Sequence, residues 1–376
     1  MDEILKTPGK CFTLCTLRWL EVRDWKFVHE EDIDELIKLR PKIEKVRIMT
    51  HCMEPHVMNK FLKWIGSEYP KKITVFHLRC ITSQIVSELA NTIRNLSHLQ
   101  TLILASTEIE DEEPYNTGPI VRALGNKPFL RVLHLLDFKQ ISMKLLFCYL
   151  KYRQIESLSL EDTNKGRENE ACILADHLRD MKQLSWFNIE NFSVSPLGTE
   201  AILKACAKCP KLATLYATGH VLKTDGALDG LVALLKKSCI RIIYLSDAQS
   251  TLNDERLLKL AEGVRVSYEL TSLEFSSGDG ASEQMLTREG VCKFVQAIGF
   301  PLHLSWLHFD AEVVGDELTE HIHYYTQKLT SKRSAILTAL VSPKLVRRIA
   351  RTNCHLTKLP KEVFRLLVPY LKFQNN

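Results

Sequence analysis

The chain has 376 residues, of which 45% are hydrophobic and 25% are charged, values that are ordinary for a soluble globular protein. The net charge is only +5, but eleven Lys or Arg and a single Glu follow residue 327, so a basic segment is expected at the C-terminal end. No stretch approaches 18 apolar residues, and the first residues hold no apolar run of signal-peptide length, so we expect neither a membrane span nor a secretion signal.

The cysteines point to a reducing environment. There are eleven of them, an odd number, without the regular pairing of a small disulfide scaffold. Several fall in predicted helices and strands, where a free Cys behaves as a small hydrophobe. We therefore predict a cytoplasmic location, with the nucleus as the alternative.

A short apolar motif recurs along the chain: an apolar residue, two variable residues, a second apolar residue, one variable residue and a third apolar residue. Its copies are Leu17/Leu20/Val22, Ile43/Val46/Ile48, Ile73/Phe76/Leu78, Leu99/Leu102/Leu104, Leu130/Leu133/Leu135, Ile155/Leu158/Leu160, Leu184/Phe187/Ile189, Leu212/Leu215/Ala217, Ile240/Ile243/Leu245, Leu270/Leu273/Phe275 and Leu304/Leu307/Phe309. These eleven copies begin 25 to 34 residues apart. A strand and a helix in each copy, at this period, are typical of a leucine-rich repeat.

The segments between the copies have a helical pattern. Glu168–Met181, Thr199–Lys208 and Leu228–Lys237 are predicted helices, because their apolar residues recur at a spacing of three to four. A single strand and helix cannot bury their own apolar faces, whereas a stack of eleven encloses a continuous core.

The repeats resemble the leucine-rich-repeat superfamily over about residues 14–325, and a period near 28 is similar to its ribonuclease-inhibitor and cysteine-containing subclasses. Cys209 and Cys239 stand shortly before a predicted strand, as in the cysteine-containing subclass. Thr224-Asp225-Gly226 and Leu252-Asn253-Asp254 resemble the turn that opens the helix, where Asp or Asn can cap the helix start. Family members usually carry Asn or Cys eight residues after the first leucine, and none of the eleven copies does.

The predicted fold is therefore an α/β leucine-rich-repeat solenoid, a horseshoe of about eleven strand–helix repeats over residues 1–330. Residues 331–376 are predicted to form a short, basic, helical C-terminal segment.

Alternate residues of each short strand are expected to point outward on the concave face. In the first three copies these positions are mostly basic, and in the last five they carry acids and aromatic rings but no Lys or Arg. Such a gradient would orient a protein partner, and Trp and Tyr dominate binding hot spots. The residues predicted to bind a partner are Trp186, Tyr216, Tyr244, Trp306, Glu190, Glu274, Asp310, Arg47 and Arg79.

After the last copy, Leu318–Leu329 is predicted to form a capping helix, because the open end of a solenoid has to be closed. The helical patterns Lys344–Arg351 and Pro360–Leu371 follow. Two interpretations of this segment remain open: a two-helix cap on the solenoid, or a tail that docks another protein. Its basic residues are not interleaved with aromatic ones, so nucleic acid is not the expected partner.

The docking reading depends on two short resemblances. The run Leu359-Pro360-Lys361-Glu362-Val363, with Leu366, Leu367, Tyr370 and Leu371, resembles the opening helix of an F-box. Pro343, Leu345, Ile349, Arg351, Leu359-Pro360 and Tyr370-Leu371 together resemble a SOCS box. Either resemblance implies docking to a ubiquitin-ligase scaffold, and the docking residues would be Leu359, Val363, Leu366 and Leu367.

The sequence holds no local motif of the common catalytic or nucleotide-binding families, such as GxxxxGK[ST], GxGxxG, HExxH or GxSxG. Cys206 and Cys209 form a lone CxxC without a second pair, so they are expected to pack at a helix end rather than to bind zinc. We predict no catalytic, cofactor-binding or metal-binding residue.

Three functions are compatible with this sequence. The first is a non-enzymatic interaction scaffold that binds a protein on its concave face. The second is the substrate-recognition subunit of a cullin-type ubiquitin ligase, which the resemblance of residues 342–371 implies. The third is a sensor tail related to innate-immune receptors, whose repeats are similar.

Overall fold

The structure is a computed structural model, and it describes most of the chain before residue 310. The described residues are 12–15, 18–23, 30–39, 42–49, 53–69, 71–106, 116–138, 141–150, 153–161, 168–192, 195–218, 223–237, 239–246, 252–276, 286–298, 304–309 and 320. Within them, no helix is both long enough and apolar enough to cross a membrane.

The strands form one twelve-stranded sheet in sequence order. Strand β1 (Phe12–Cys15) pairs antiparallel with β2 (Trp19–Arg23), and every later pairing is parallel. The other strands are β3 (Lys45–Met49), β4 (Val75–Ile81), β5 (Thr101–Ser106), β6 (Val132–Leu136), β7 (Ser157–Ser159), β8 (Trp186–Ile189), β9 (Thr214–Thr218), β10 (Ile242–Ser246), β11 (Ser272–Phe275) and β12 (Trp306–Phe309). The eleven parallel strands coincide with the eleven predicted copies of the motif.

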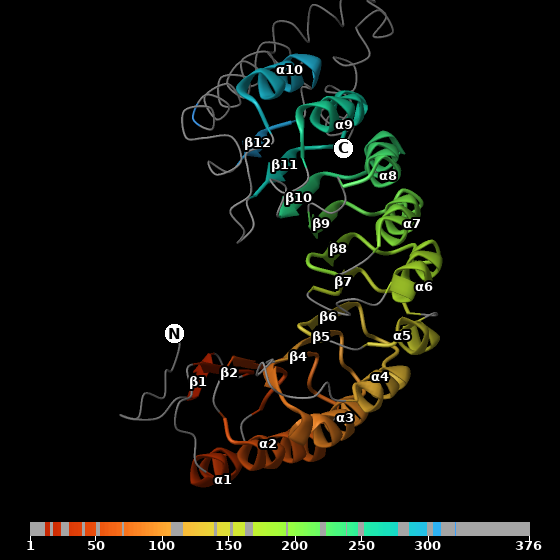
Figure 1. The fold of residues 1–376 in the computed structure, drawn as a ribbon. Coiled ribbons are helices and arrows are strands. Elements are labelled where there is room, and N and C mark those ends of the chain that lie inside the picture. The colour runs from red at the N-terminus through yellow and green to blue at the C-terminus, as the bar shows by residue number, and fades with distance from the viewer. Residues whose placement is uncertain are drawn as a thin grey trace, which may run out of the picture.

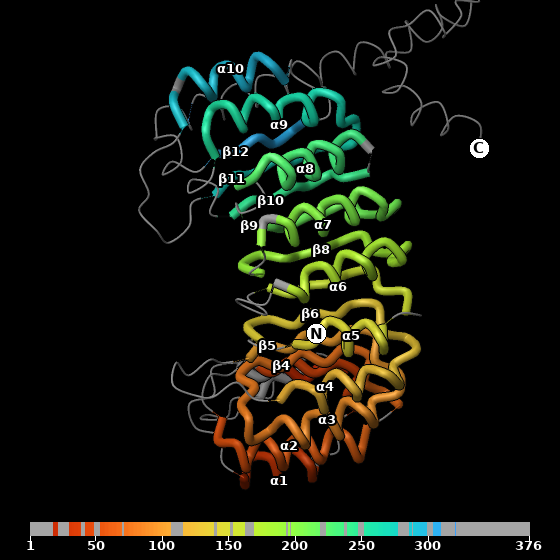
Figure 2. The backbone as a smooth tube through the Cα atoms, turned by 45° about the vertical axis from the view of Figure 1, so that its right-hand side comes forward, coloured from red at the N-terminus to blue at the C-terminus, as the bar shows by residue number. Residues whose placement is uncertain are grey.

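An α-helix follows each of the strands β2 to β11 along the chain. The helices are α1 (Glu30–Leu39), α2 (Pro55–Glu68), α3 (Val86–Asn95), α4 (Gly118–Ala123), α5 (Met143–Leu150), α6 (Glu168–Leu178), α7 (Pro196–Cys206), α8 (Asp225–Lys237), α9 (Asp254–Val266) and α10 (Arg288–Ile298). The strands line the inner side of a curved stack and the helices cover its outer side (Figures 1 and 2). This arrangement confirms the leucine-rich-repeat solenoid.

The core runs as a continuous layer between the sheet and the helices. The second apolar residue of the motif is fully buried in nearly every strand, as at Leu102, Leu215 and Leu273. Helix residues such as Leu203 and Leu260 meet this layer from the other side, and neither is exposed to solvent. Burial of the apolar residues therefore fixes which residues of each strand face outward.

A backbone hydrogen-bond ladder joins all eleven repeats at the start of their strands. In each repeat the amide of the residue after the first apolar residue donates to the carbonyl of the same position one repeat earlier, at 2.7–2.9 Å. The ladder begins with Glu44 N donating to Arg18 O and ends with Ser305 N donating to Thr271 O. Because it uses main-chain groups, it places no demand on side chains at this position.

Two turns open their helices with side-chain caps. Asn253 Oδ1 accepts a hydrogen bond from Arg256 N at 2.9 Å, as predicted for the start of α9. At α8 the structure corrects the prediction, because Thr224 Oγ1 accepts from Ala227 N at 3.3 Å and Asp225 is the first helical residue. A threonine hydroxyl one residue earlier accepts from the free amide in the same way.

Side-chain donors also tie repeats together. Cys209 Sγ donates to Leu178 O at 3.2 Å, and Cys239 Sγ donates to Pro210 O at 3.1 Å. Lys127 is fully buried, and its Nζ donates to Arg94 O and Leu96 O, both at 2.9 Å. Burial, followed by the charge of Arg94, lowers the pKa of Lys127 to about 8. Cys209 and Lys127 thereby satisfy carbonyls at the ends of α6 and α3.

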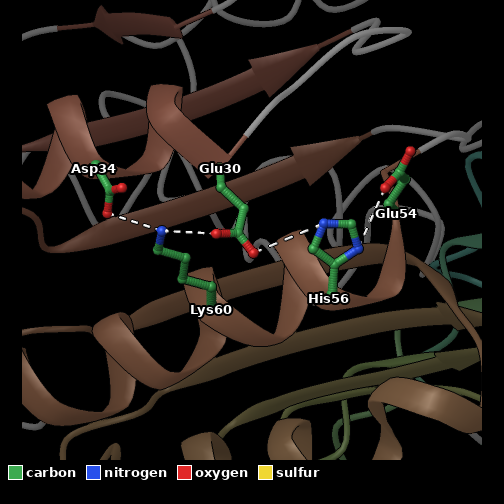
Figure 3. Close-up of polar contacts among 5 residues, drawn as sticks. All are labelled: Glu30, Asp34, Glu54, His56 and Lys60. Atoms are coloured by element: carbon green, nitrogen blue, oxygen red, sulfur yellow. Dashed lines mark hydrogen bonds and ion pairs between the residues drawn. The ribbon is translucent and has the colours of Figure 1, made fainter.

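Ion pairs join the first two helices on the outer face (Figure 3). Lys60 Nζ lies 3.3 Å from Glu30 Oε2 and 2.9 Å from Asp34 Oδ1. His56 lies between Glu30 and Glu54, with nitrogen–oxygen distances of 3.8 and 3.3 Å. Exposed pairs of this kind contribute little stability individually, so we interpret the group as orienting α1 on α2.

Several predicted features lie outside the described residues. They are Asp310, the capping helix Leu318–Leu329 apart from Glu320, and the whole segment 331–376, including Leu359, Val363, Leu366 and Leu367. The boundary predicted near residue 330 also lies there.

Candidate functional site

The outward-facing strand residues of the concave face form rows, because each strand pairs in register with the next. The middle row consists of Glu21, Arg47, His77, Ile103, His134, Ser159, Asn188, Tyr216, Tyr244, Glu274 and His308. A second row, two residues earlier in each strand, includes Trp19, Ser157, Trp186 and Trp306. Neighbouring strands lie about 4.8 Å apart, so adjacent members of a row can contact one another.

Four rings make a continuous series on this face, which we call the aromatic row: His134, Trp186, Tyr216 and Tyr244. The rings of His134 and Trp186 stack with centroids 4.9 Å apart. Trp186 and Tyr216 follow at 5.4 Å with a tilt of 44°, and Tyr216 and Tyr244 at 5.4 Å with a tilt of 39°. All four side chains are half-buried. Tilted and offset rings at these distances attract one another.

Hydrogen bonds hold the two ends of the aromatic row. His134 Nε2 lies 2.8 Å from Ser157 Oγ, and the Tyr244 hydroxyl lies 2.9 Å from the Ser276 hydroxyl. The rings are therefore oriented before any partner arrives. His134 stands at an outward position of the fifth copy but was not among the predicted binding residues. The sequence signal was its alignment with Tyr216 and Tyr244, three and four strands away.

Trp306 lies apart from the aromatic row. It is on β12, at the same outward strand position as Trp186, and its ring stacks on His308 with centroids 5.9 Å apart. It is the most exposed of the predicted rings, at 41%. The structure thus brings together three of the four predicted rings and places the fourth two strands beyond Tyr244.

Carboxylates flank the aromatic row. Burial, and then the negative charges of Glu190 and Glu274, raise the pKa of Tyr216. Glu274 is also the register neighbour of Tyr244 across β10 and β11. Among the described outward positions of β7–β12 there is no Lys or Arg, so this half of the face carries negative charge.

The other end of the face carries positive charge, part of which is neutralised. Arg47 Nη1 lies 3.3 Å from Glu21 Oε1, and Glu21 is only 6% exposed. Within the described part of the chain, Arg79 forms no ion pair. Burial, and then the charges of Arg47 and Arg79, lower the pKa of His77 to about 4.

The CxxC pair packs in the interior. Cys206 and Cys209 are both buried at the C-terminal end of α7. Burial raises the pKa of Cys209 to about 11 and that of Cys206 well above its ordinary value. A thiol that resists ionisation is a poor nucleophile and a poor metal ligand. Among the described residues, no group of three His, Cys, Asp or Glu could hold a metal ion.

Comparison with known proteins finds solved structures of similar fold. The chain is similar to a chain in the crystal structure of a Rad7 and Elc1 complex from yeast, with a TM-score of 0.47 and 14% sequence identity, over 73% of this chain and 71% of that one. No protein-family model matches the sequence, and no curated protein matches it either.

Proposed function

We propose that this chain is a non-enzymatic interaction scaffold that holds a partner protein on the concave face of its solenoid. The observation that carries this proposal is the aromatic row, a continuous series of half-exposed rings that are already stacked on one another. Trp and Tyr are enriched among the residues that dominate binding energy. Rings that are oriented in advance lose little further freedom when a partner binds.

The charges around the aromatic row favour a particular kind of partner. Glu190 and Glu274 lie close enough to Tyr216 to raise its pKa. A partner segment that covers the rings would therefore be favoured if it carried Arg or Lys, which also interact well with aromatic faces. Trp306, stacked on His308 further along the face, would provide a second and more exposed contact.

A second candidate function is the substrate-recognition subunit of a cullin-type ubiquitin ligase. Its support comes from the sequence: Leu359, Val363, Leu366 and Leu367 stand in a run that resembles the opening helix of an F-box. In this case the concave face would hold the substrate, and the C-terminal segment would dock the ligase. The role of the aromatic row is the same in both candidates.

Affinity purification from cells, read by mass spectrometry, tests the two candidates together. Tyr216→Ala is expected to weaken binding of the captured partner by about 2 kcal/mol or more, because it removes a ring from the middle of the aromatic row. Tyr268→Ala is the matched control, since Tyr268 is 49% exposed and lies outside the row. A double Leu366→Asp and Leu367→Asp variant of the full chain tests the docking tail.

The outcomes separate the candidates. If Tyr216→Ala retains its partners as well as Tyr268→Ala does, the concave face is not the binding surface. Cullin-type subunits that are lost only from the Leu366/Leu367 variant would support the ligase candidate. Captured proteins that are unchanged in that variant and include no ligase subunit would leave a plain scaffold.

A further inference from the structure

Three nitrogen-bearing side chains lie together at the positive end of the concave face. Arg47 on β3 and His77 on β4 are register partners across the parallel pair. Arg79 follows two residues later on β4, on the same face of the strand, which places it about 6.6 Å further along. The charges of Arg47 and Arg79 both act on His77, as expected for groups in close proximity.

Each of these side chains has a buried nitrogen without a hydrogen-bond partner: Arg47 Nε, His77 Nε2 and Arg79 Nε. Only four side-chain nitrogens of the described residues are in this condition, and three of them are here. His77 is only 8% exposed. Buried nitrogens are nearly always hydrogen-bonded in folded proteins, so three unpartnered ones at one place indicate that a ligand supplies the acceptors.

The local charge suits an anion. Arg47 and Arg79 are positive. Among the described residues, Glu21 is the one carboxylate that pairs with the group, through Arg47 Nη1 rather than Nε. His77 is neutral near pH 7, because burial and the two arginines lower its pKa to about 4. The neutral ring can still donate through Nε2, and a bound anion would offset the excess positive charge.

The backbone of β4 is irregular next to this group. The pairing of β4 with β5 shifts register between Leu78 and Ile81, and Cys80 has a φ of 68°. A non-glycine residue seldom adopts this left-handed conformation. The irregularity interrupts the regular strand directly after Arg79, and bulges are common beside active sites.

We propose that Arg47, His77 and Arg79 form an oxyanion-binding site on the concave face, and that its ligand is a phosphate group. Three donors from three side chains match a tetrahedral anion, which offers more acceptor oxygens than the two of a carboxylate. Arginine is the side chain best suited to phosphate, because its planar fork of N–H groups fits the oxygens. The phosphate can come from inorganic phosphate or from a phosphorylated residue of a partner.

An NMR titration of the full-length chain, with labelled histidine, tests the proposal. One arm uses inorganic phosphate, and the other uses N-acetyl-phosphoserine amide as the probe for a phosphorylated residue. We expect saturable shifts of the His77 ring resonances and a rise in the His77 pKa from about 4, because the bound anion stabilises the protonated ring. Tighter binding in one arm identifies the source of the phosphate.

Substitutions test the geometry. Arg79→Gln is expected to weaken phosphate binding about tenfold or more, and Arg79→Lys should weaken it as well, because lysine keeps the charge but lacks the Nε–H group. Arg131→Gln is the control, since Arg131 is an exposed arginine that pairs with Glu156 at another repeat.

The proposal is overturned if His77 shows no saturable shift, or if Arg79→Gln binds phosphate as tightly as the unaltered chain. An equal loss in Arg131→Gln would also overturn it, since that result would indicate general attraction to positive charge. The His77 resonance itself reports whether each variant is folded. No partner protein is needed, so the result is independent of the proposed scaffold function.

Discussion

At the scale of single residues, burial lowers the pKa of two histidines on the concave face, His77 and His134. Burial lowers the pKa of His134 to about 4, and burial together with Arg47 and Arg79 does the same for His77. Both rings are therefore neutral at pH 7, and His134 stacks on Trp186 as a neutral ring. Desolvation of this kind disfavours the protonated form.

The low pKa of His134 predicts a pH dependence of stability. The ordinary pKa is 6.5 and the folded value is about 4, so the unfolded chain binds more protons between these two pH values. The contribution of the neutral His134 ring to the free energy of unfolding is complete above pH 6.5. It is lost as the pH falls toward 4, by at most about 1.4 kcal/mol per pH unit for one histidine.

His134→Gln should therefore reduce the loss of unfolding free energy between pH 6.5 and 4, measured by urea denaturation at a series of pH values. Glutamine cannot take up a proton but can still hydrogen-bond to Ser157. His98→Gln is the control, because His98 is exposed. An unchanged pH slope in His134→Gln would contradict the prediction.

At the scale of helices and strands, glycine allows neighbouring helices to approach closely. A Cβ atom placed on Gly230 of α8 would lie 2.9 Å from Leu203 Cβ on α7. A Cβ atom on Gly263 of α9 would lie 3.3 Å from Val232 Cα on α8. The spacing of α7, α8 and α9 therefore depends on the absence of a side chain at these two positions.

Gly230→Ala should lower the free energy of unfolding by about 1–3 kcal/mol, because the added methyl group overlaps a packed neighbour. In an uncrowded helix the same change would raise stability by up to about 1 kcal/mol, so the sign of the effect is diagnostic. Urea denaturation measures it, with Cys172→Ala on the exposed side of α6 as the control. A gain in stability would show that the two helices can move apart at little cost.

Helix and strand positions were predicted more accurately than their ends. The helix predicted at Glu168–Met181 runs from Glu168 to Leu178, and the one predicted at Thr199–Lys208 begins earlier, at Pro196. Ser195 caps that helix by accepting from Gly198 N at 3.1 Å. Strand β1 was not predicted, since its antiparallel pairing with β2 lies outside the repeat.

At the scale of the whole molecule, each repeat packs against its two neighbours along the stack. The sheet runs in sequence order from β1 to β12, and neighbouring helices follow the same order. Stability in such a stack is approximately a sum of repeat and neighbour contributions, so a local defect need not unfold the entire chain.

Leu245→Ala should test this property, because Leu245 is fully buried in β10 and its truncation should cost about 2–5 kcal/mol. We expect faster amide hydrogen exchange in β9, β10 and β11 and in helices α8 and α9, with little change in β3–β5. Hydrogen exchange with mass spectrometry measures both regions in one sample. Equal acceleration along the whole chain would instead show that the solenoid unfolds as one unit.

The sequence by itself determined the repeat, its eleven copies and the outward-facing positions. The reason is physical: a strand of period two that must bury its apolar residues leaves no choice of register, and the spacing of the copies leaves room for one helix between them. The rings on strands β8, β9 and β10 could therefore be named as a group before their contacts were known.

Only the tertiary structure decided which of these outward residues meet. The ring of His134 on β6 stacks on Trp186 of β8, and Trp306 stacks on His308 of its own strand. Arg47 pairs with Glu21, while Arg47 Nε, His77 Nε2 and Arg79 Nε remain without partners. Register partners on neighbouring parallel strands are 25 to 34 residues apart in sequence. No local pattern encodes which way two such side chains turn, because that choice depends on the packing of both repeats at once.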